Sequence, residues 1–210
     1  MSNTVLHGFS GSTYVRTARI ILHRKGVPYD QNPVDVLAGE PGQPEHLARH
    51  PFGKVPVLDI DGHRLRETDA IVRYLEATRD GPSALPESAW DRARADEIVS
   101  LVHAYGYDAL VGVAFYHIKP EFIGNPSEDR HRETLERAKT FMALVGEIRG
   151  GDDWLAGAHV SLADYTLAPI LFYTGMTPHQ DELLAAGGLS DWWDRIRADD
   201  HFAATEPAMG

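Results

Sequence analysis

Residues 55–75 hold the signals that decide the fold: Val-Pro-Val-Leu-Asp-Ile-Asp-Gly-His-Arg-Leu-Arg-Glu-Thr-Asp-Ala-Ile-Val-Arg-Tyr-Leu. The apolar run 55–60 predicts a strand, and Asp61-Gly62 is typical of a tight hairpin turn. A second strand begins at Arg64-Leu65, and Thr68 opens a segment whose apolar residues recur at helical spacing. Two strands joined by a hairpin and followed at once by a helix indicate a domain that mixes strands and helices.

The residues before this stretch extend the same domain. They predict a strand at 4–7, a helix that ends at Gly26-Val27-Pro28, and a second strand at 29–36. Two prolines and a glycine within 41–44 predict irregular structure there. The resulting order, β-α-β-loop-β-β-α, predicts an α/β domain with a mixed sheet.

Beyond residue 79 the composition changes. A stretch rich in Pro and Gly predicts a linker over 80–88, and helical periodicity dominates after it. Residues 90–116 are expected to form one long helix or a broken pair, and further helices are predicted at 133–148, 165–173 and 189–197. Ser161 and Asp164 have the spacing of a capping box. The sequence therefore predicts an α/β domain at 1–79 and an all-helical domain at 89–210.

Composition and charge exclude several classes of function. The chain has 210 residues, a net charge of −11 and no cysteine. The acidic charge argues against nucleic-acid binding, and the missing cysteines exclude disulfides, Cys-ligated zinc and a cysteine nucleophile. We see no signal peptide, and we expect no apolar stretch to approach the about 18 residues of a membrane helix. We therefore expect a cytoplasmic protein without a membrane partner.

Pro56 is unusual because it lies in a predicted strand. Proline lacks the N–H group that a strand interior needs, so it belongs either at a sheet edge or in a cis bond. A cis Val55–Pro56 bond would turn the Val55 backbone outward, where an extended peptide can pair with it. Both interpretations stay open from the sequence.

Ser12 lies between the first strand and the first helix. It is expected to cap that helix, whose start offers free N–H groups and positive potential. These features favour an anion, and a hydroxyl there is suited to stabilising a bound thiolate. Action as a nucleophile would need a neighbouring base, and the sequence identifies none.

Glu67 and Thr68 stand where the second strand of the hairpin meets its helix. Thr68 is expected to be the N-cap residue. Its hydroxyl and the nearby N–H groups can hold a carboxylate, while Glu67 can hold an ammonium group. Together the two residues form a clamp suited to an amino acid.

The chain's eleven histidines are not expected to bind metal. His46 and His50 share i,i+4 spacing, but no glutamate completes a metalloprotease motif, so surface or capping roles are expected. No dinucleotide-binding glycine motif, phosphate-binding loop or hydrolase triad is present either.

These motifs occur together in one known family. Residues 44–58, Pro-Glu-His-Leu-Ala-Arg-His-Pro-Phe-Gly-Lys-Val-Pro-Val-Leu, followed by Glu67-Thr68 and the helix after it, resemble the cytosolic glutathione S-transferases. The resemblance is strongest to the serine-type phi class, with theta and other bacterial classes close. It implies a thioredoxin-like N-terminal domain, an all-α C-terminal domain, a homodimer, and glutathione as co-substrate in detoxification.

The resemblance also assigns site residues. Ser12 would hold the glutathione thiolate, with Ser10 as fallback and Thr13 as a second possible hydroxyl. Val55, before Pro56, would pair with the cysteinyl unit through its backbone. Glu67 and Thr68 would grip the γ-glutamyl group. The phi-class lysine before Pro44 is missing here, so Gln43 or Lys54 would have to contact the glycyl carboxylate; Asp164 is carried over as structural only.

The implied activity is attack of the glutathione thiolate on an apolar electrophile, with peroxide reduction on the same site as an alternative. A non-catalytic binding module is a further alternative that the missing lysine favours slightly. The electrophile is expected to lie against the helical domain. An aromatic stretch there is expected to line its pocket, to pack in the core or to form a dimer contact: Tyr105, Tyr107, Phe115, Tyr116 and His117.

Overall fold

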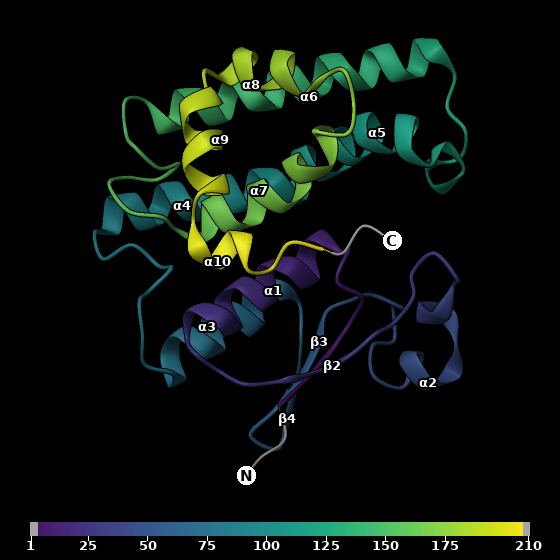
Figure 1. Cartoon of the computed structure of the whole chain (residues 1–210), viewed down its shortest axis with the longest axis vertical. Helices are drawn as coiled ribbons and strands as arrows, with labels where there is room; N and C mark the ends of the chain where they lie inside the picture. Colours follow the sequence, from purple (N-terminus) through teal and green to yellow (C-terminus); the bar gives the residue numbers. More distant parts are fainter. Residues whose placement is uncertain (1–3, 208–210) are drawn as a thin grey trace. The chain divides into compact units, whose positions relative to one another are not determined.

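The computed structural model describes residues 4–207, which form two compact units (Figure 1). The first unit runs to Ser83 and also includes the residues from Asp200 onward. The second unit spans Ala84–Asp199. The last residues thus belong to the α/β unit, whereas the sequence placed them in the helical domain.

A four-stranded mixed sheet forms the centre of the first unit, in the order β2-β1-β3-β4. Its strands are β1 (Val5–His7), β2 (Asp30–Asn32), β3 (Val57–Ile60) and β4 (His63–Arg66). β1 is parallel to β2 and antiparallel to β3, and β3 is antiparallel to β4. The predicted mixed sheet is confirmed. β2 is shorter than predicted because Pro33 follows it and has no N–H to donate.

Two main helices accompany this sheet, α1 (Thr13–Arg24) and α3 (Thr68–Thr78), and they pack against each other (Figure 1). Their apolar faces and those of the strands form one core. Its fully buried members include Leu6, Ile20, Ile21, Leu58, Ile71 and Leu75.

Short helices complete the first unit. The loop after β2 contains the 3-10 turn η1 (Glu40–Gly42) and the helix α2 (Pro44–Leu47). The prediction of irregular structure over 41–44 is therefore wrong: each proline stands in the first turn, where its missing N–H costs nothing. α10 (Asp200–Ala203) packs against α1.

The second unit begins with a continuous rod made of α4 (Ala89–Leu101), a π-helical turn η2 (Val102–Gly106) and α5 (Tyr107–Ile118). This confirms the long-helix alternative. Gly106 lets the ring of Phe141 pack closely against the rod, because a Cβ atom there would lie 2.5 Å from that ring.

The same rod corrects one expectation about membranes. By length and composition, Ala89–Ile118 has a window apolar enough to cross a bilayer, with a mean hydropathy of 1.5 and 44% of that window buried in the protein. Buried core helices pass the same test, and α4 and α5 both pack against α7. The rod is weak evidence for a membrane span, but the expectation that no apolar stretch is long enough is wrong, since the described residues contain one.

Three of the remaining elements pack against this rod: η3 (Pro120–Ile123), α6 (Glu128–Arg149) and α7 (Leu162–Thr174). The last two, α8 (Gln180–Gly187) and α9 (Ser190–Arg197), pack against α6 and α7, respectively, and against each other. α7 is buried over almost its whole length, as its apolar sequence predicts. α8 was not predicted.

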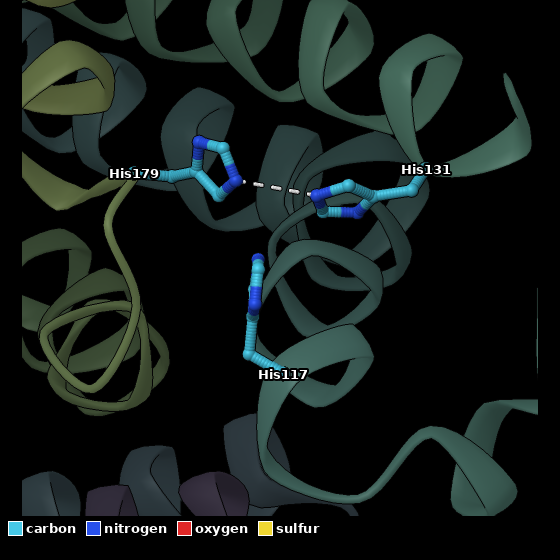
Figure 2. A group of neighbouring side chains, drawn as sticks. All are labelled: His117, His131 and His179. Atoms are coloured by element: carbon cyan, nitrogen blue, oxygen red, sulfur yellow. Dashed lines mark hydrogen bonds between the residues drawn. The ribbon is translucent and has the colours of Figure 1, made fainter. Parts of the chain in front are cut away.

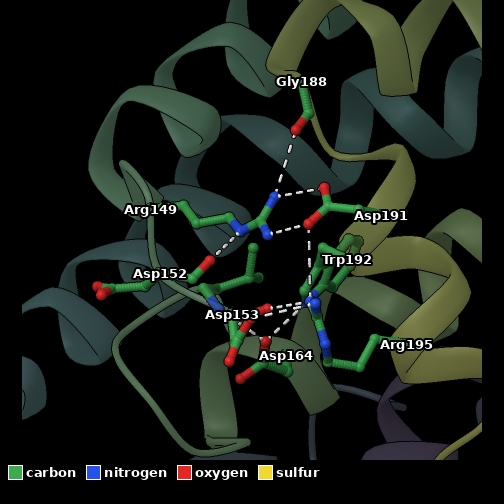
Figure 3. Close-up of polar contacts among 9 residues, drawn as sticks. Arg149, Asp152, Asp153, Asp164, Gly188, Asp191, Trp192 and Arg195 are labelled. Atoms are coloured by element: carbon green, nitrogen blue, oxygen red, sulfur yellow. Dashed lines mark hydrogen bonds and ion pairs between the residues drawn. The ribbon is translucent and has the colours of Figure 1, made fainter.

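Asp164 joins three parts of the second unit, and its surroundings are drawn in Figure 3. The carboxylate is fully buried and accepts hydrogen bonds from the backbone N–H groups of Leu155 (3.0 Å) and Ser161 (2.7 Å). It also accepts from the Ser161 hydroxyl and from Trp192 Nε1, at 2.9 and 2.8 Å. The predicted capping box is present. Burial raises the pKa of Asp164, against the effect of these four donors.

An ion pair lies near this junction. The Arg149 guanidinium binds Asp191 through two nitrogens, and it also donates to the backbone oxygens of Asp152 and Gly188 (Figure 3). Chiefly through its hydrogen bonds to the Asp191 carboxylate, Arg149 lowers the pKa of Asp191 to about 2. The pair therefore fastens the end of α6 to the start of α9.

Candidate functional site

Strand register brings the candidate segments to one edge of the sheet. His7 lies opposite Val57, and Val57 lies opposite Arg66. The residues that follow β1, precede β3 and follow β4 therefore leave the sheet at the same edge. These residues include Ser12, Val55-Pro56 and Glu67-Thr68, three segments that are distant in sequence.

Gly8 allows the close packing at this edge. Its φ angle is +150°, and a Cβ atom there would lie 2.4 Å from Val15 Cγ2 and 3.4 Å from Val55 Cβ. Only glycine fits such a position. The chain after β1 is thereby held between the first turn of α1 and the residue before Pro56.

Ser12 is the N-cap of α1, as predicted, and is half-buried. Its Oγ accepts a hydrogen bond from the Val15 N–H at 3.4 Å. That bond uses a lone pair, so the hydroxyl proton remains available to a ligand. α1 carries no acidic residue in its first turn, which leaves its positive end uncompensated.

The two other candidate hydroxyls differ from Ser12. Ser10 lies in the turn before the helix. Thr13 is the first residue of α1 and is 9% exposed, and its Oγ1 is buried without a hydrogen-bond partner among the residues described. Among the three, Ser12 combines partial exposure with the capping position.

The Val55–Pro56 peptide bond is cis, which confirms the second of the two interpretations. Val55 is half-buried and Pro56 is buried, and β3 begins only at Val57. The proline thus lies just outside the ladder, where its missing N–H breaks no strand pairing.

Glu67 and Thr68 start α3 in an unusual backbone conformation. Glu67 occupies the N-cap position with φ +68° and ψ 125°, a region that non-glycine residues rarely adopt. The expectation that Thr68 is the N-cap is wrong, since Thr68 is the first helical residue and is buried. Residues held in such strained conformations concentrate at ligand sites.

Two buried histidines support the loop that leads into β3, and the sequence did not predict that role. His46 and His50 are each 2% exposed, so the expectation of surface positions is wrong. His46 Nε2 lies 2.8 Å from the backbone oxygen of Lys54, and His50 Nε2 lies 3.6 Å from Glu67 Oε1. They contact the chain just before the cis bond and at the start of α3.

The candidate residues for a terminal carboxylate are both exposed. Lys54 lies directly before Val55, and Gln43 is the N-cap of α2 without a side-chain capping bond. Both belong to the loop between β2 and β3.

A titratable group in β1 has a structural role. Asn32 donates to His7 Nδ1 at 2.9 Å, so the proton lies on Nε2, which donates to Asp59 at 3.0 Å. Burial lowers the pKa of His7, partly opposed by Asp59. His7 is thus a neutral link between β2, β1 and β3.

The aromatic stretch of the second unit packs largely within that unit. The Phe115 ring lies 5.0 Å from Phe122 and 5.9 Å from Tyr173, and Tyr116 stacks on His131 at 3.8 Å between centroids. Tyr105 is exposed. These contacts favour the packing role that the sequence left open.

Known proteins share both parts of this architecture. The family model described as glutathione S-transferase, N-terminal domain, matches residues 6–83, and the corresponding C-terminal domain matches residues 107–200. Among solved structures, glutathione S-transferase-I bound with lactoylglutathione has a TM-score of 0.82, with 25% identity over 97% of this chain and 98% of that one.

Full-length relatives have two different names. The chain is 29% identical to the probable glutathione S-transferase GSTF2 of Oryza sativa, over 94% of this chain and 93% of the relative. It is 30% identical to the maleylacetoacetate isomerase of Pseudomonas aeruginosa, over 97% of this chain and 92% of the relative. With both domains matched and relatives aligned along its length, the chain belongs to the glutathione S-transferase family.

Proposed function

We propose that this protein is a glutathione transferase that joins the sulfur of glutathione to electrophilic, apolar small molecules. The observation that carries the proposal is the position of Ser12. Its hydroxyl, with a proton to donate, stands at the positive end of α1, on the sheet edge that also carries Val55 and Glu67.

The energetics of thiolate formation fit this site. A thiol with a pKa of about 8.5 needs a drop of about 1.5–2 units to be mostly ionised at neutral pH, which corresponds to about 2–3 kcal/mol. A hydrogen bond to a charged group contributes about 1.5–3 kcal/mol, and a helix N-terminus adds about 0.3–1 kcal/mol. The Ser12 hydroxyl and α1 together supply enough.

The reaction then needs little further chemistry from the protein. The thiolate sulfur donates an electron pair to the electrophilic carbon and a C–S bond forms. In a substitution, the leaving group departs with its bonding pair; in an addition, the neighbouring carbon takes up a proton from water. Holding the two reactants together supplies most of the remaining acceleration.

The rest of the tripeptide would bind along the same edge. The Val55 backbone would pair with the cysteinyl unit as an added strand. Glu67 would hold the γ-glutamyl ammonium, while the Thr68 hydroxyl and the first N–H groups of α3 would hold the neighbouring carboxylate. Lys54 or Gln43 would contact the glycyl carboxylate.

Titration of bound glutathione tests the proposal directly. The ultraviolet absorbance of the thiolate, followed against pH, should give a pKa at least one unit below that of free glutathione in the wild type. Ser12→Ala should shift that pKa back toward the free value, whereas Ser10→Ala should leave it low. An unchanged pKa in Ser12→Ala would remove Ser12 from its role.

Retention on immobilised glutathione separates the enzyme from a non-catalytic module. Retention together with conjugation of a chloro-nitroaromatic compound supports the transferase. Failure to be retained would favour the module. Turnover of an organic hydroperoxide but of no conjugation substrate would favour the peroxidase.

The isomerase relative favours a second candidate on the same site. A thiolate that adds to an activated carbon–carbon double bond and later leaves with its electron pair allows rotation about that bond, with no net consumption of glutathione. Incubation with maleylacetoacetate distinguishes the two: isomerisation returns glutathione intact, whereas conjugation consumes it.

A homodimer in the cytoplasm completes the proposal. It is supported by membership of the family. Sedimentation at micromolar concentration should show a particle of twice the 23.2 kDa chain mass. Particles of the chain mass alone would overturn the dimer and leave the chemistry of Ser12 untouched.

A further inference from the structure

Three histidines face one another in the second unit, on three different elements (Figure 2). His117 is in the last turn of α5, His131 is near the start of α6, and His179 directly precedes α8. Each pair of ring centroids is 5.2 Å apart, and one nitrogen from each ring lies within 4.8 Å of the others. None of them belongs to the proposed glutathione site.

We propose that His117, His131 and His179 form a binding site for a divalent first-row transition metal, with Zn²⁺ as the expected ion. Imidazole is a preferred ligand of this class of metals, and three histidines are sufficient for a zinc centre. The proposal departs from the sequence-based expectation that the histidines bind no metal.

The spacing of two ligands already fits the ion. His131 Nε2 and His179 Nε2 are 3.2 Å apart. Two nitrogens bound at about 2.0–2.1 Å in tetrahedral geometry would be separated by about 3.3–3.4 Å. The separation of this pair therefore already matches that of two nitrogens sharing one ion. His117 is exposed at the end of α5, so its side chain has room to turn inward.

The outer contacts fix the orientation of two of the three ligands. Glu182 accepts from His179 Nδ1 at 2.5 Å, which leaves the Nε2 lone pair of His179 directed at the cluster. Lys139 in turn binds Glu182 at 2.7 Å. A carboxylate behind a ligating histidine is the usual outer partner of such sites. The Tyr116 ring stacks on His131 with an interplanar angle of 8° and fixes its plane.

The cluster combines a buried ligand with an accessible one. His131 is 7% exposed and His117 is open to solvent, so the cluster has a buried floor and an entry path.

A bound ion would fasten three helices of the second unit together and would keep a fourth position for water or a small ligand. At this point, ring contacts and one histidine–histidine hydrogen bond already join the end of α5, the start of α6 and the residue before α8. The site therefore predicts that metal raises the melting temperature.

Calorimetric titration of the chelator-treated full chain with Zn²⁺ tests the proposal. One site per chain is expected, together with a rise in melting temperature. Co²⁺ should bind at the same stoichiometry and give the visible absorption bands of a four-coordinate, nitrogen-ligated ion. Absence of saturable binding, or a Co²⁺ spectrum indistinguishable from that of the aqueous ion, would overturn it.

Variants locate the site. His117→Ala, at an exposed position that leaves the core intact, should abolish the Co²⁺ bands, and His179→Ala should do the same. Glu182→Gln should weaken Zn²⁺ binding by about 10- to 100-fold, as expected for the loss of an outer partner.

Two histidines elsewhere provide matched controls. His159→Ala removes an exposed histidine of the same unit. His23→Ala removes one of an exposed pair with His201, whose Nδ1 atoms are 2.9 Å apart in the first unit. Both variants should bind as the wild type does. Equal loss in either control would place the metal elsewhere and overturn the assignment, while the glutathione titration of Ser12 would be unaffected.

Discussion

Two helix starts in this protein use a serine in opposite ways. At α7, the Ser161 hydroxyl donates to Asp164, and the fully buried carboxylate receives four hydrogen bonds. At α1, Ser12 is half-buried, accepts one long bond from Val15, and has no acidic neighbour in the first turn. The first arrangement is complete without a ligand, and the second is not. The comparison teaches that a helix start with unused hydrogen-bonding capacity is a better candidate for a ligand site than one with more polar groups.

The largest expected effect is the loss of stability in Asp164→Ala. The change leaves three buried N–H donors without partners, those of Leu155, Ser161 and Trp192, at about 1–3 kcal/mol each. Urea unfolding should therefore show a loss of several kcal/mol. Asp164→Asn, which keeps one acceptor oxygen, should lose less. A loss below about 1 kcal/mol in Asp164→Ala would contradict the structural role.

Ser12→Ala should have the opposite effect to Asp164→Ala, with a large loss of activity and a small loss of stability. Loss of one hydrogen-bond donor to a reacting anion typically costs about 10²- to 10³-fold in rate, and we expect a kcat/KM for conjugation reduced to that extent. Loss of an N-cap costs about 0.5–2 kcal/mol of stability. Steady-state kinetics and urea unfolding on the same preparation compare the two. If the variant loses much stability and its kinetics are unchanged, Ser12 has a purely structural capping role like that of Ser161.

Glu67→Gly should increase the stability of the protein while decreasing its affinity for glutathione. Glycine adopts positive φ readily, so relief of the strained Glu67 backbone should stabilise the protein by about 1 kcal/mol. Affinity for glutathione should fall because the carboxylate for the ammonium group is lost. Glu67→Gln serves as the matched control, since it should lose affinity without gaining stability. Tighter binding by Glu67→Gly would contradict the assignment.

The smallest effect concerns acid stability, to which each unit contributes one ion pair. Arg64 in the first unit and Arg149 in the second lower the pKa of Asp59 and Asp191, respectively, to about 2, chiefly by hydrogen bonding. A lowered pKa means that the contribution to stability is present above the ordinary value near 3.8 and is lost as pH falls through about 2. Both side chains are partly exposed, so each pair is worth about 1 kcal/mol or less.

Unfolding followed from pH 5 downward tests this pair of carboxylates. Asp59→Asn and Asp191→Asn should each flatten the acid limb of the stability curve, by a similar small amount. An acid limb as steep as that of the wild type in both variants would show that other carboxylates control it.

Local sequence patterns were sufficient to predict much of the fold and several features of the candidate site at the sheet edge. Ser12 could be predicted as a cap because a glycine–serine cluster stands directly before a helical period. The cis bond at Pro56 was one of only two arrangements that a proline beside a strand permits. The order of strands and helices followed from the hairpin at Asp61-Gly62 and its flanking periods.

Other features depend on contacts between distant segments, which no local pattern encodes. His46 and His50 are buried because the loop folds back onto Lys54 and Glu67. The three clustered histidines are separated by 14 and 48 residues and have no common motif. The assignment of Thr68 as N-cap failed by one residue, because the sequence gives no sign of the positive φ angle at Glu67.

The contact between α1 and α10 has a consequence for how the first unit folds. Buried Arg16 donates to the Phe202 backbone oxygen at 3.0 Å, its guanidinium lies 3.8 Å from the Phe202 ring centroid, and Arg19 donates to the Thr205 oxygen at 3.0 Å. The helix that Ser12 caps is therefore covered by residues 186 positions later in the chain. Because the first unit is discontinuous in sequence, its stretch up to Ser83 cannot complete the packing around α1 until the residues from Asp200 onward join it.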